Sequence, residues 1–364
     1  MADADPSALI ADDESLHRKD ADYLREQEKA SEVSGKLKRR STMHALKRAL
    51  GKFGADGGTD MAAALTYYAV LSLFPALIAL VSLLGVFGQG EETIDAIMEM
   101  LEGAVPEDAM AFIRGPIEQL VNTPAAGFAL IAGLLGALWT ASGYVGAFSR
   151  ALNRIYGVKE GRPIWKLRPL LLAVTFLMVV IVACAGLMLT LSGGIAEEIF
   201  DLVGLGEVAL TVWGIAKWPA MLFMFVLVLA TLYQLTPNVQ RPKFRLLSLG
   251  GFVALLVAAL GGVGFGFYAT NFGSYNATYG SLAGIIMFLL LLWIVNNALL
   301  LGAEIDSELE RARLLRAGID AEEHVALPLR DESGVRKAHE KQAKTIADAA
   351  DIRRDAVAEN ARDR

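Results

Sequence analysis

Six long apolar runs constrain this chain more than any other feature. They cover roughly residues 61–86, 127–148, 170–192, 218–235, 246–268 and 281–303. A helix of about 20 apolar residues crosses the hydrocarbon core of a bilayer, and the runs are close to that length or longer. The fourth run is the shortest, and its helix is expected to begin earlier, near Val208. Together with a mean hydropathy of +0.42, the runs predict an all-α polytopic membrane bundle with six transmembrane helices.

The charges between these runs alternate from one loop to the next. Seven, six and three Lys and Arg residues fall in residues 36–52, 149–169 and 236–245. The intervening segments 87–126 and 193–217 hold eight and four acidic residues but one basic residue each, and 269–280 carries no charge. Basic loops are retained in the cytoplasm. The alternation therefore predicts that both termini are cytoplasmic.

Composition divides the chain into three parts. Residues 1–40 begin with a stretch of ten acidic and four basic residues over 1–32, which predicts a disordered cytoplasmic head without a signal peptide. Residues 41–312 form the membrane domain. Residues 313–364 form a charged cytoplasmic tail, which is expected to continue the sixth span as a helix broken near Gly318 and Pro328.

Two further segments have amphipathic patterns. In residues 41–54, Met43, Leu46, Leu50 and Phe53 recur at helical spacing among basic residues. This pattern indicates a helix on the anionic membrane surface, or an elbow helix that leads into the first span. The outer loop 87–126 holds two apolar stripes separated by Pro106, which predict two short amphipathic helices.

The residue types exclude several kinds of chemistry. The four histidines lie in the terminal regions at least 15 residues apart, and Cys184 is the single cysteine. Neither pattern supports a metal site or a disulfide. No GxxxxGK[ST] or GxSxG motif is present, and the net charge of −6 gives no support for nucleic-acid binding. We expect no enzymatic activity, no cofactor and no nucleic-acid partner.

The polar residues of the sixth span are the first candidates for function. Trp293, Asn297 and Glu304 fall on one helical stripe, whereas Asn296 lies about 100° away. An unpaired amide in hydrocarbon costs several kcal/mol, so these groups must face other helices or water. One interpretation is interhelical hydrogen bonding, with Glu304 paired to Arg150, Arg154 or Lys166. The other is a polar surface that holds a lipid headgroup or a proton.

The first span carries a second set of candidates. Tyr67 and Tyr68 lie near its predicted cytoplasmic third, and Ser72 follows one turn later. Pro75 interrupts the backbone hydrogen bonds near the middle of the membrane, which is tolerated where the freed carbonyls are buried or line a cavity. These four residues complete the set of substrate-path candidates.

Three motifs resemble the YihY/virulence factor BrkB family. They are DMAAALTYYAVLSLFPALIALVSLLG (Asp60–Gly85), LYQLTPNVQRPKFRLLSLGG (Leu232–Gly251) and YGSLAGIIMFLLLLWIVNNALLLGAEIDSELERAR (Tyr279–Arg313). Asn296 and Asn297 depart from the small or apolar residues common at those positions. The resemblance implies a multi-pass protein of the bacterial inner membrane. It also implies the lipid-related transport proposed for some members, whereas the old ribonuclease label of others finds no support in these residues.

Two functional hypotheses follow from these features. The first is a transporter or flippase for a lipid-like or amphipathic substrate, with membrane lipids as its partners. The second is a membrane-anchored scaffold or envelope-integrity protein that binds a cytoplasmic protein through residues 319–364. Self-association into a homo-oligomer is compatible with both.

Overall fold

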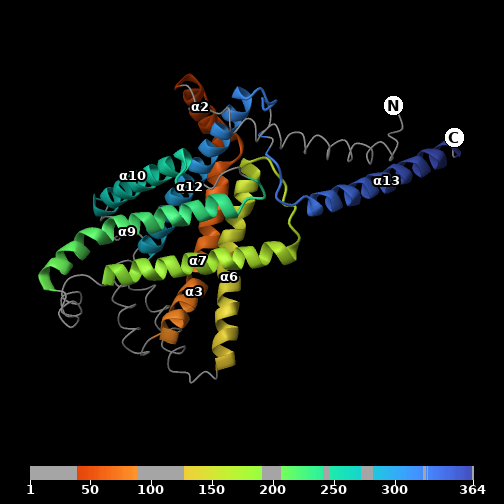
Figure 1. Ribbon diagram of the computed structural model, residues 1–364. Coiled ribbons are helices and arrows are strands. Elements are labelled where there is room, and N and C mark those ends of the chain that lie inside the picture. The colour runs from red at the N-terminus through yellow and green to blue at the C-terminus, as the bar shows by residue number, and fades with distance from the viewer. Residues whose placement is uncertain are drawn as a thin grey trace.

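The computed structural model describes residues 39–87, 127–190, 206–240, 246–271, 282–322, 325 and 327–362. These residues form eight α-helices, as the all-α prediction requires (Figure 1). The helices are α2 (Arg39–Ala55), α3 (Gly58–Phe87), α6 (Gly127–Ile155), α7 (Ile164–Thr190), α9 (Gly206–Leu235), α10 (Leu249–Asn271), α12 (Leu282–Arg316) and α13 (Ser333–Arg362). The helices predicted for the outer loop, and all but the last two residues of the acidic head, lie outside the described residues.

Four segments of these helices are long and apolar enough to cross a membrane. They are Ile164–Met188, Val208–Leu235, Leu249–Tyr268 and Gly284–Arg316. They correspond to the third to sixth predicted runs, and the fourth run does begin at Val208. Helices α3 and α6 cover the first two predicted runs but are not among these four segments. The structure thus supports a membrane protein with several spans, while the count of six and the orientation stay predictions.

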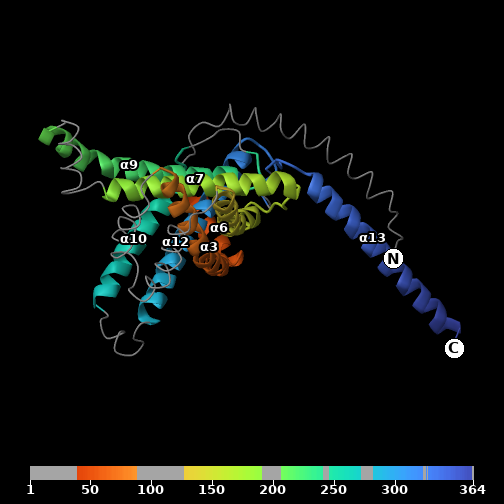
Figure 2. The same ribbon diagram turned by 90° about the horizontal axis from the view of Figure 1, so that it is seen from below.

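The helices associate in pairs around α12. Helix α3 lies against α6, α7 against α9, and α10 against α12, and α12 also contacts α2, α3 and α6 (Figures 1 and 2). The backbones of α10 and α12 meet at two glycines: a Cβ added to Gly250 would lie 2.0 Å from the carbonyl oxygen of Gly302. Only glycine permits this approach, which is a common device for packing membrane helices.

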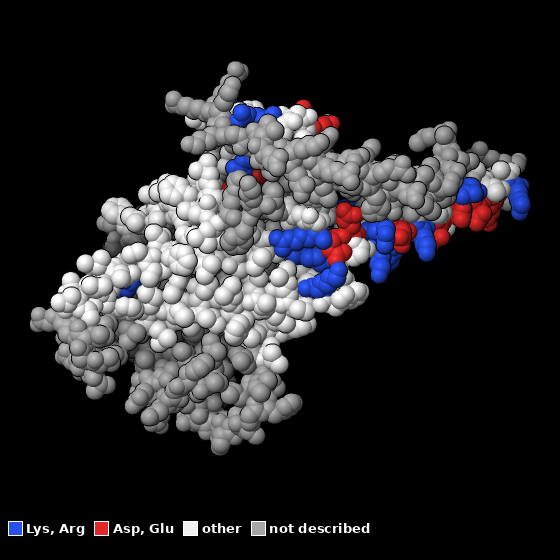
Figure 3. Space-filling model, in the orientation of Figure 1, with Lys and Arg blue, Asp and Glu red and all other residues white. Residues whose placement is uncertain are grey.

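The largest buried cluster lies near the C-terminal end of α6. Phe148 is fully buried and stacks on Tyr233 of α9 at a ring-centroid distance of 6.2 Å. Leu152, Ile155 and Leu300 complete the centre of this cluster. By contrast, large apolar side chains on α7, α9 and α10 are exposed. Uncharged residues dominate the visible face of the bundle (Figure 3), as expected for a surface in contact with lipid.

The tail returns to the bundle before it leaves again. Helix α12 ends at Arg316, and the turn after it contains Gly318, which has a φ of +80° and lets Ile319 N–H bond to the carbonyl of Leu314. The strap, residues 327–334, then lies against the α6–α7 connection and the segment after α9. There Arg330 Nε donates to the carbonyl of Val239 (3.0 Å), and Asn238 Nδ2 donates to the carbonyl of Asp331 (3.0 Å). Beyond the strap, α13 projects away from the bundle and buries none of its residues (Figures 1 and 2).

Candidate functional site

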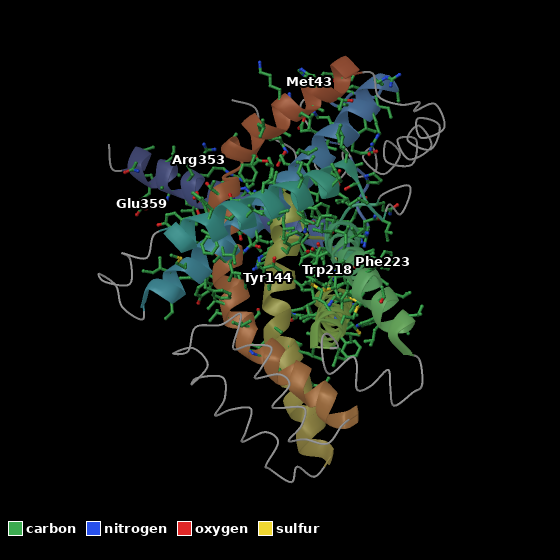
Figure 4. The ribbon with its side chains drawn as sticks, turned by 90° about the vertical axis from the view of Figure 1, so that its left-hand side faces the viewer. Met43, Tyr144, Trp218, Phe223, Arg353 and Glu359 are labelled. Carbon is green, nitrogen blue, oxygen red and sulfur yellow. The ribbon has the colours of Figure 1, made fainter. Side chains whose placement is uncertain are left out.

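The two adjacent asparagines of α12 have different partners. Asn296 is buried and joins three helices, because its Nδ2 donates to Thr66 Oγ1 on α3 (3.2 Å) and its Oδ1 accepts from Tyr144 Oη on α6 (2.9 Å). Tyr144 lies within the bundle (Figure 4). Asn297 instead donates to the carbonyl of Trp293 (2.7 Å), one turn earlier in its own helix. Asn296 therefore forms hydrogen bonds between helices, as the first interpretation expects, whereas the Asn297 hydrogen bond stays within α12.

The predicted stripe on α12 is divided between different contacts. The Nε1 of Trp293 donates to the carbonyl of Thr59 (3.3 Å), so this indole fixes the start of α3. Glu304, at the far end of the stripe, is completely buried. Its partner is Lys52 of α2, whose Nζ lies 2.9 Å from Glu304 Oε1. Of the interpretations left open for Glu304, a pairing with Arg150, Arg154 or Lys166 is wrong, because α2 packs against this part of α12 and supplies Lys52.

Lys52 also bonds to two other groups. Its Nζ donates to the carbonyl of Ile155 at the end of α6 (2.8 Å) and lies 3.3 Å from Asp56 Oδ2. Three donors on one ammonium thus connect α2, α6 and α12. The Lys52 ammonium thus binds the end of α6 and the end of the apolar part of α12.

A second charged contact lies one turn later in α12 and one turn earlier in α2. Glu308 Oε2 is 3.2 Å from Arg48 Nε on α2 and 2.8 Å from Arg311 Nε. Arg311 Nη1 also donates to the carbonyl of Glu322 (2.9 Å), beyond the end of α12. We call Arg48, Lys52, Glu304, Glu308 and Arg311 the charge ladder.

The carboxylates of the charge ladder are incompletely satisfied. Glu304 and Glu308 are both fully buried, yet Glu304 Oε2 and Glu308 Oε1 accept no hydrogen bond from the described residues. Buried carboxylates normally have all their oxygens hydrogen-bonded, because their desolvation is expensive. The charge ladder thus holds two buried carboxylate oxygens without a hydrogen bond from the described residues, at the boundary between apolar and charged sequence in α12.

Small side chains bring α2 close enough to form the ladder. Ala45 and Ala49 are buried against Ile305 and Leu309 of α12. The helix predicted for residues 41–54 is confirmed, and its predicted apolar stripe is divided: Leu46 and Phe53 pack against buried clusters, whereas the other two residues face outward. Met43, labelled in Figure 4, and Leu50 are 58% and 63% exposed. An outward apolar face beside basic residues agrees with the expected position at a membrane surface.

The candidates of the first span divide between surface and interior. Tyr67 is 62% exposed and meets Tyr68 edge-on at 5.6 Å. The guanidinium of Arg150 lies over the Tyr68 ring, with Cζ 5.5 Å from its centroid. Ser72 is buried, and Pro75 lies inside α3, which continues beyond it to Phe87. None of these four is hydrogen-bonded to Glu304 in the part of the chain that the structure describes.

The basic connection between α6 and α7 forms a structural network. Arg162 Nη2 donates to Glu160 Oε2 and to the carbonyl of Thr236 (both 2.7 Å). Burial alone raises the pKa of Glu160, but hydrogen bonds from Arg162 and Asn153 hold that pKa below its usual value. Nearby, Lys166 Nζ pairs with Asp331 Oδ2 of the strap at 2.7 Å. These cations secure loops and are occupied by acidic partners.

Sequence reasoning missed four functional positions. Thr66 and Tyr144 complete the bonding of Asn296, and Arg48 and Lys52 complete the charge ladder. One signal was present for the ladder: the cations of α2 and the acids of α12 are both four residues apart, so they match in register. No three His, Cys, Asp or Glu side chains in the described ranges are grouped closely enough to hold a metal ion.

Comparison with known proteins places these features in a family. The model of the family virulence factor BrkB matches residues 49–325. The chain is 29% identical over 273 residues to a ribonuclease-like protein, YfkH, of Bacillus subtilis (strain 168), across 75% of this chain and 98% of that protein. It is 31% identical over 263 residues to a UPF0761 membrane protein of Aeromonas salmonicida (strain A449), across 70% and 84% of the two chains.

A third relative is longer than the matched region. Identity to a UPF0761 membrane protein of Rhodospirillum centenum (strain ATCC 51521 / SW) is 29% over 279 residues, across 74% of this chain and 58% of that one. The chain thus spans little more than half of that relative. No solved structure matches the chain. Since the family model matches well over half of the chain, the chain belongs to the virulence factor BrkB family of membrane proteins.

Proposed function

We propose that the protein moves a lipid-like or amphipathic substrate across the membrane, with α2 as a gate at one end of the path. The observation that carries this proposal is the charge ladder. Two fully buried carboxylates at the end of the apolar part of α12 are held by Arg48 and Lys52, and each has an oxygen that no described group bonds. Buried ionisable groups in membrane helices commonly mark substrate or proton pathways.

The balance of energies favours a moving contact over a permanent anchor. Replacing a buried ion pair by packed apolar side chains is often neutral or stabilising by about 1–4 kcal/mol, so stability alone is a weak reason to bury these charges. Arg48 and Lys52 are 39% and 25% exposed at their side chains, whereas their carboxylate partners are not exposed at all. The cations are therefore accessible to an anionic headgroup that approaches from the surface.

Exchange of partners gives the gate a physical basis. When α2 moves outward, Lys52 and Arg48 leave Glu304 and Glu308 and bind the phosphate of the substrate, for which both side chains have affinity. The carboxylates then gain access to water. The contact between Ala45, Ala49 and α12 keeps the cost of this motion low, because small side chains have little apolar area to separate.

A lipid-like substrate fits better than a small ion. Ion pathways require charged groups repeated along a span. In α12 the charged residues begin only at Glu304, and α10 carries none. The exposed surfaces of α7, α9 and α10 are apolar, which suits a substrate whose chains stay in hydrocarbon while its headgroup crosses.

The test uses purified protein in liposomes with fluorescent lipids in both leaflets. An impermeant reductant quenches about half of the signal if lipids stay in place, and more if the protein moves them. We expect quenching beyond half with the wild type and not with Glu304→Gln, which preserves the shape of the buried side chain. The control is Glu310→Gln, which removes a partly exposed carboxylate paired with Arg313 on the same helix.

Three results are informative. Quenching that stops at half for the wild type would overturn lipid movement. Quenching beyond half for both Glu304→Gln and the wild type would leave lipid movement standing and remove the charge ladder from it. Loss of movement in Glu310→Gln as well would show that any acid of α12 matters, against the specific role of Glu304.

The free helix α13 supports a second candidate, a scaffold. It buries no residue, and Ile346, Ile352 and Val357 are 60%, 70% and 64% exposed. Deletion of residues 335–364 retains the strap and removes this surface. If the protein is a scaffold, the deletion abolishes partner recovery and the cellular phenotype together; full activity without α13 would contradict that role.

Ribonuclease activity, which the name of the Bacillus relative mentions, is not part of this proposal. The cations Arg162 and Lys166 of the basic connection are engaged by Glu160 and Asp331. These two cations are therefore engaged within the protein and give no support for RNA binding.

A further inference from the structure

One face of α6 carries an unusual order of side chains. Trp139, Gly143, Gly146 and Arg150 are spaced by four, three and four residues, so they lie on the same side of the helix. Trp139 is 53% exposed, and Arg150 is exposed. This face lies next to α3 and α7, both of which contact α6.

Arg150 extends along the glycines of this face. A Cβ added to Gly146 would lie 3.5 Å from Arg150 Nη1, and one added to Gly143 would lie 3.8 Å from Tyr68 Cδ1. The guanidinium therefore runs back toward the N-terminus of α6 and covers the Tyr68 ring, with Cζ 5.5 Å from the centroid. Stacking on an aromatic ring holds the charge in place and leaves its edge N–H groups available.

A second arginine joins this face from α7. Arg168 Cζ lies 4.7 Å from the centroid of the Trp139 ring, and Leu171, one turn later, would contact a Cβ on Gly146 at 3.4 Å. No carboxylate of the described residues forms an ion pair with Arg150 or Arg168, in contrast to Arg162 and Lys166 nearby. Two stacked guanidinium groups thus present unneutralised charge on one side of the bundle.

The surface beyond the arginines is apolar. Leu135, one turn before Trp139, is 59% exposed, and Tyr67 and Leu71 on α3 are 62% and 49% exposed. From Arg150 to Leu135, α6 rises by roughly 22 Å, which is comparable to the length of a lipid headgroup with its acyl chain. Charge at one end and exposed apolar side chains at the other match the two parts of a phospholipid.

We propose that Arg150, Arg168, Tyr68 and Trp139 form a binding site for the phosphate of an anionic membrane phospholipid. The guanidinium groups bind the phosphate oxygens, and the acyl chains lie along Leu135 and Leu71. The inference deepens the proposed function by naming its substrate class, and it rests on that function only for movement of the bound lipid. Binding itself is a separate property and can be measured alone.

The experiment measures lipid binding to the purified full-length protein by native mass spectrometry. Phosphatidylglycerol and phosphatidylcholine are titrated against the wild type, Arg150→Gln/Arg168→Gln and Lys217→Gln. The last variant is the matched control, because Lys217 also lies over an indole ring, that of Trp218 at 5.6 Å, but on α9. Figure 4 shows Trp218 on α9, away from the α6 face.

We expect the wild type to prefer phosphatidylglycerol. Each cation near a membrane surface contributes about five-fold in affinity, so the double variant should bind it about 25-fold more weakly, while Lys217→Gln changes little. Equal affinity for both lipids in the wild type, or equal loss in Lys217→Gln, would overturn the site. Displacement of the lipid by millimolar inorganic phosphate would also contradict it, since that result identifies a free-anion site.

The liposome assay separates this inference from the proposed function. Selective binding without lipid movement would leave the site intact and remove the transport proposal. Lipid movement without selective binding would remove only the site. Unfolding temperatures of the variants, measured alongside, ensure that a lost signal reflects lost binding and not a lost fold.

Discussion

The ion pair between Lys52 and Glu304 offers the sharpest test of how α2 is held. Substitution of Lys52→Ala removes the ammonium that lies 2.9 Å from Glu304 Oε1 and 2.8 Å from the carbonyl of Ile155. Glu304 is then a completely buried carboxylate whose other oxygen also lacks a partner among the described residues. The variant should therefore lose more stability than removal of a surface lysine.

The magnitude follows from the burial of the two partners. Breaking a buried ion pair from one side costs about 3–5 kcal/mol, because the remaining charge is left uncompensated. The Lys52 side chain is 25% exposed, so water enters the vacated position and the lower limit applies. A loss of about 3 kcal/mol corresponds to a fall in unfolding temperature of roughly 4 °C for 364 residues, at about 2.1 cal/mol/K of unfolding entropy per residue.

Thermal unfolding in detergent measures this effect against two controls. Lys47→Ala removes an exposed lysine from the same helix and should change the unfolding temperature by less than about 2 °C. Lys52→Ala/Glu304→Gln removes the stranded charge and should recover at least half of the loss. If Lys52→Ala behaves like Lys47→Ala, or if the double variant is no more stable than the single one, the charge ladder does not hold α2 as described.

Three further predictions concern contacts elsewhere in the bundle. Gly250→Ala should destabilise the protein by about 1–3 kcal/mol in thermal unfolding, because the new methyl group collides with the backbone of Gly302. The control Gly264→Ala places its methyl group in open space and should be neutral or slightly stabilising. Asn296→Leu should cost about 1 kcal/mol, because the Tyr144 hydroxyl loses its acceptor and Thr66 loses one of its two hydrogen bonds, and Asn297→Leu should cost less; equal losses would contradict their different bonding. The pKa of Asp331, lowered to about 2 by bonds to Lys166 and Ser333, means that the strap keeps this stabilisation above about pH 4 and loses it as the pH falls toward 2. In the wild type, pepsin should therefore release the tail faster as the pH falls from about 4 to about 2. In Asp331→Asn, the rate of release should be the same at about pH 4 and about pH 2.

The sequence predicted elements well and long-range partners poorly. The length of α12, the turn at Gly318 that follows it and the helix of residues 41–54 all follow from local patterns. That Asn296 needs a partner inside the bundle was also predictable, but Thr66 and Tyr144 are 230 and 152 residues away, and no local pattern specifies which helix is its neighbour.

The same limit explains the error at Glu304. Charge counting pointed to the basic residues near the end of α6, yet Lys166 pairs with Asp331 of the strap and Arg150 stacks on Tyr68. Lys52 was assigned to a membrane-surface helix on the strength of its apolar stripe. In the structure, Ala45 and Ala49 pack closely on α12, because small side chains allow a contact that larger ones prevent. This contact brings Lys52 to Glu304, which the apolar stripe alone did not predict.

The strap determines how far the tail can act. Because residues 327–334 bond to the connections after α6 and after α9, the root of α13 is fixed to the bundle and does not swing from a loose joint. Thirty residues of helix then reach roughly 45 Å. A molecule bound near the end of α13 would be held at that distance from the bundle, so lengthening or shortening the helix by whole turns would change its reach in steps of about 5 Å.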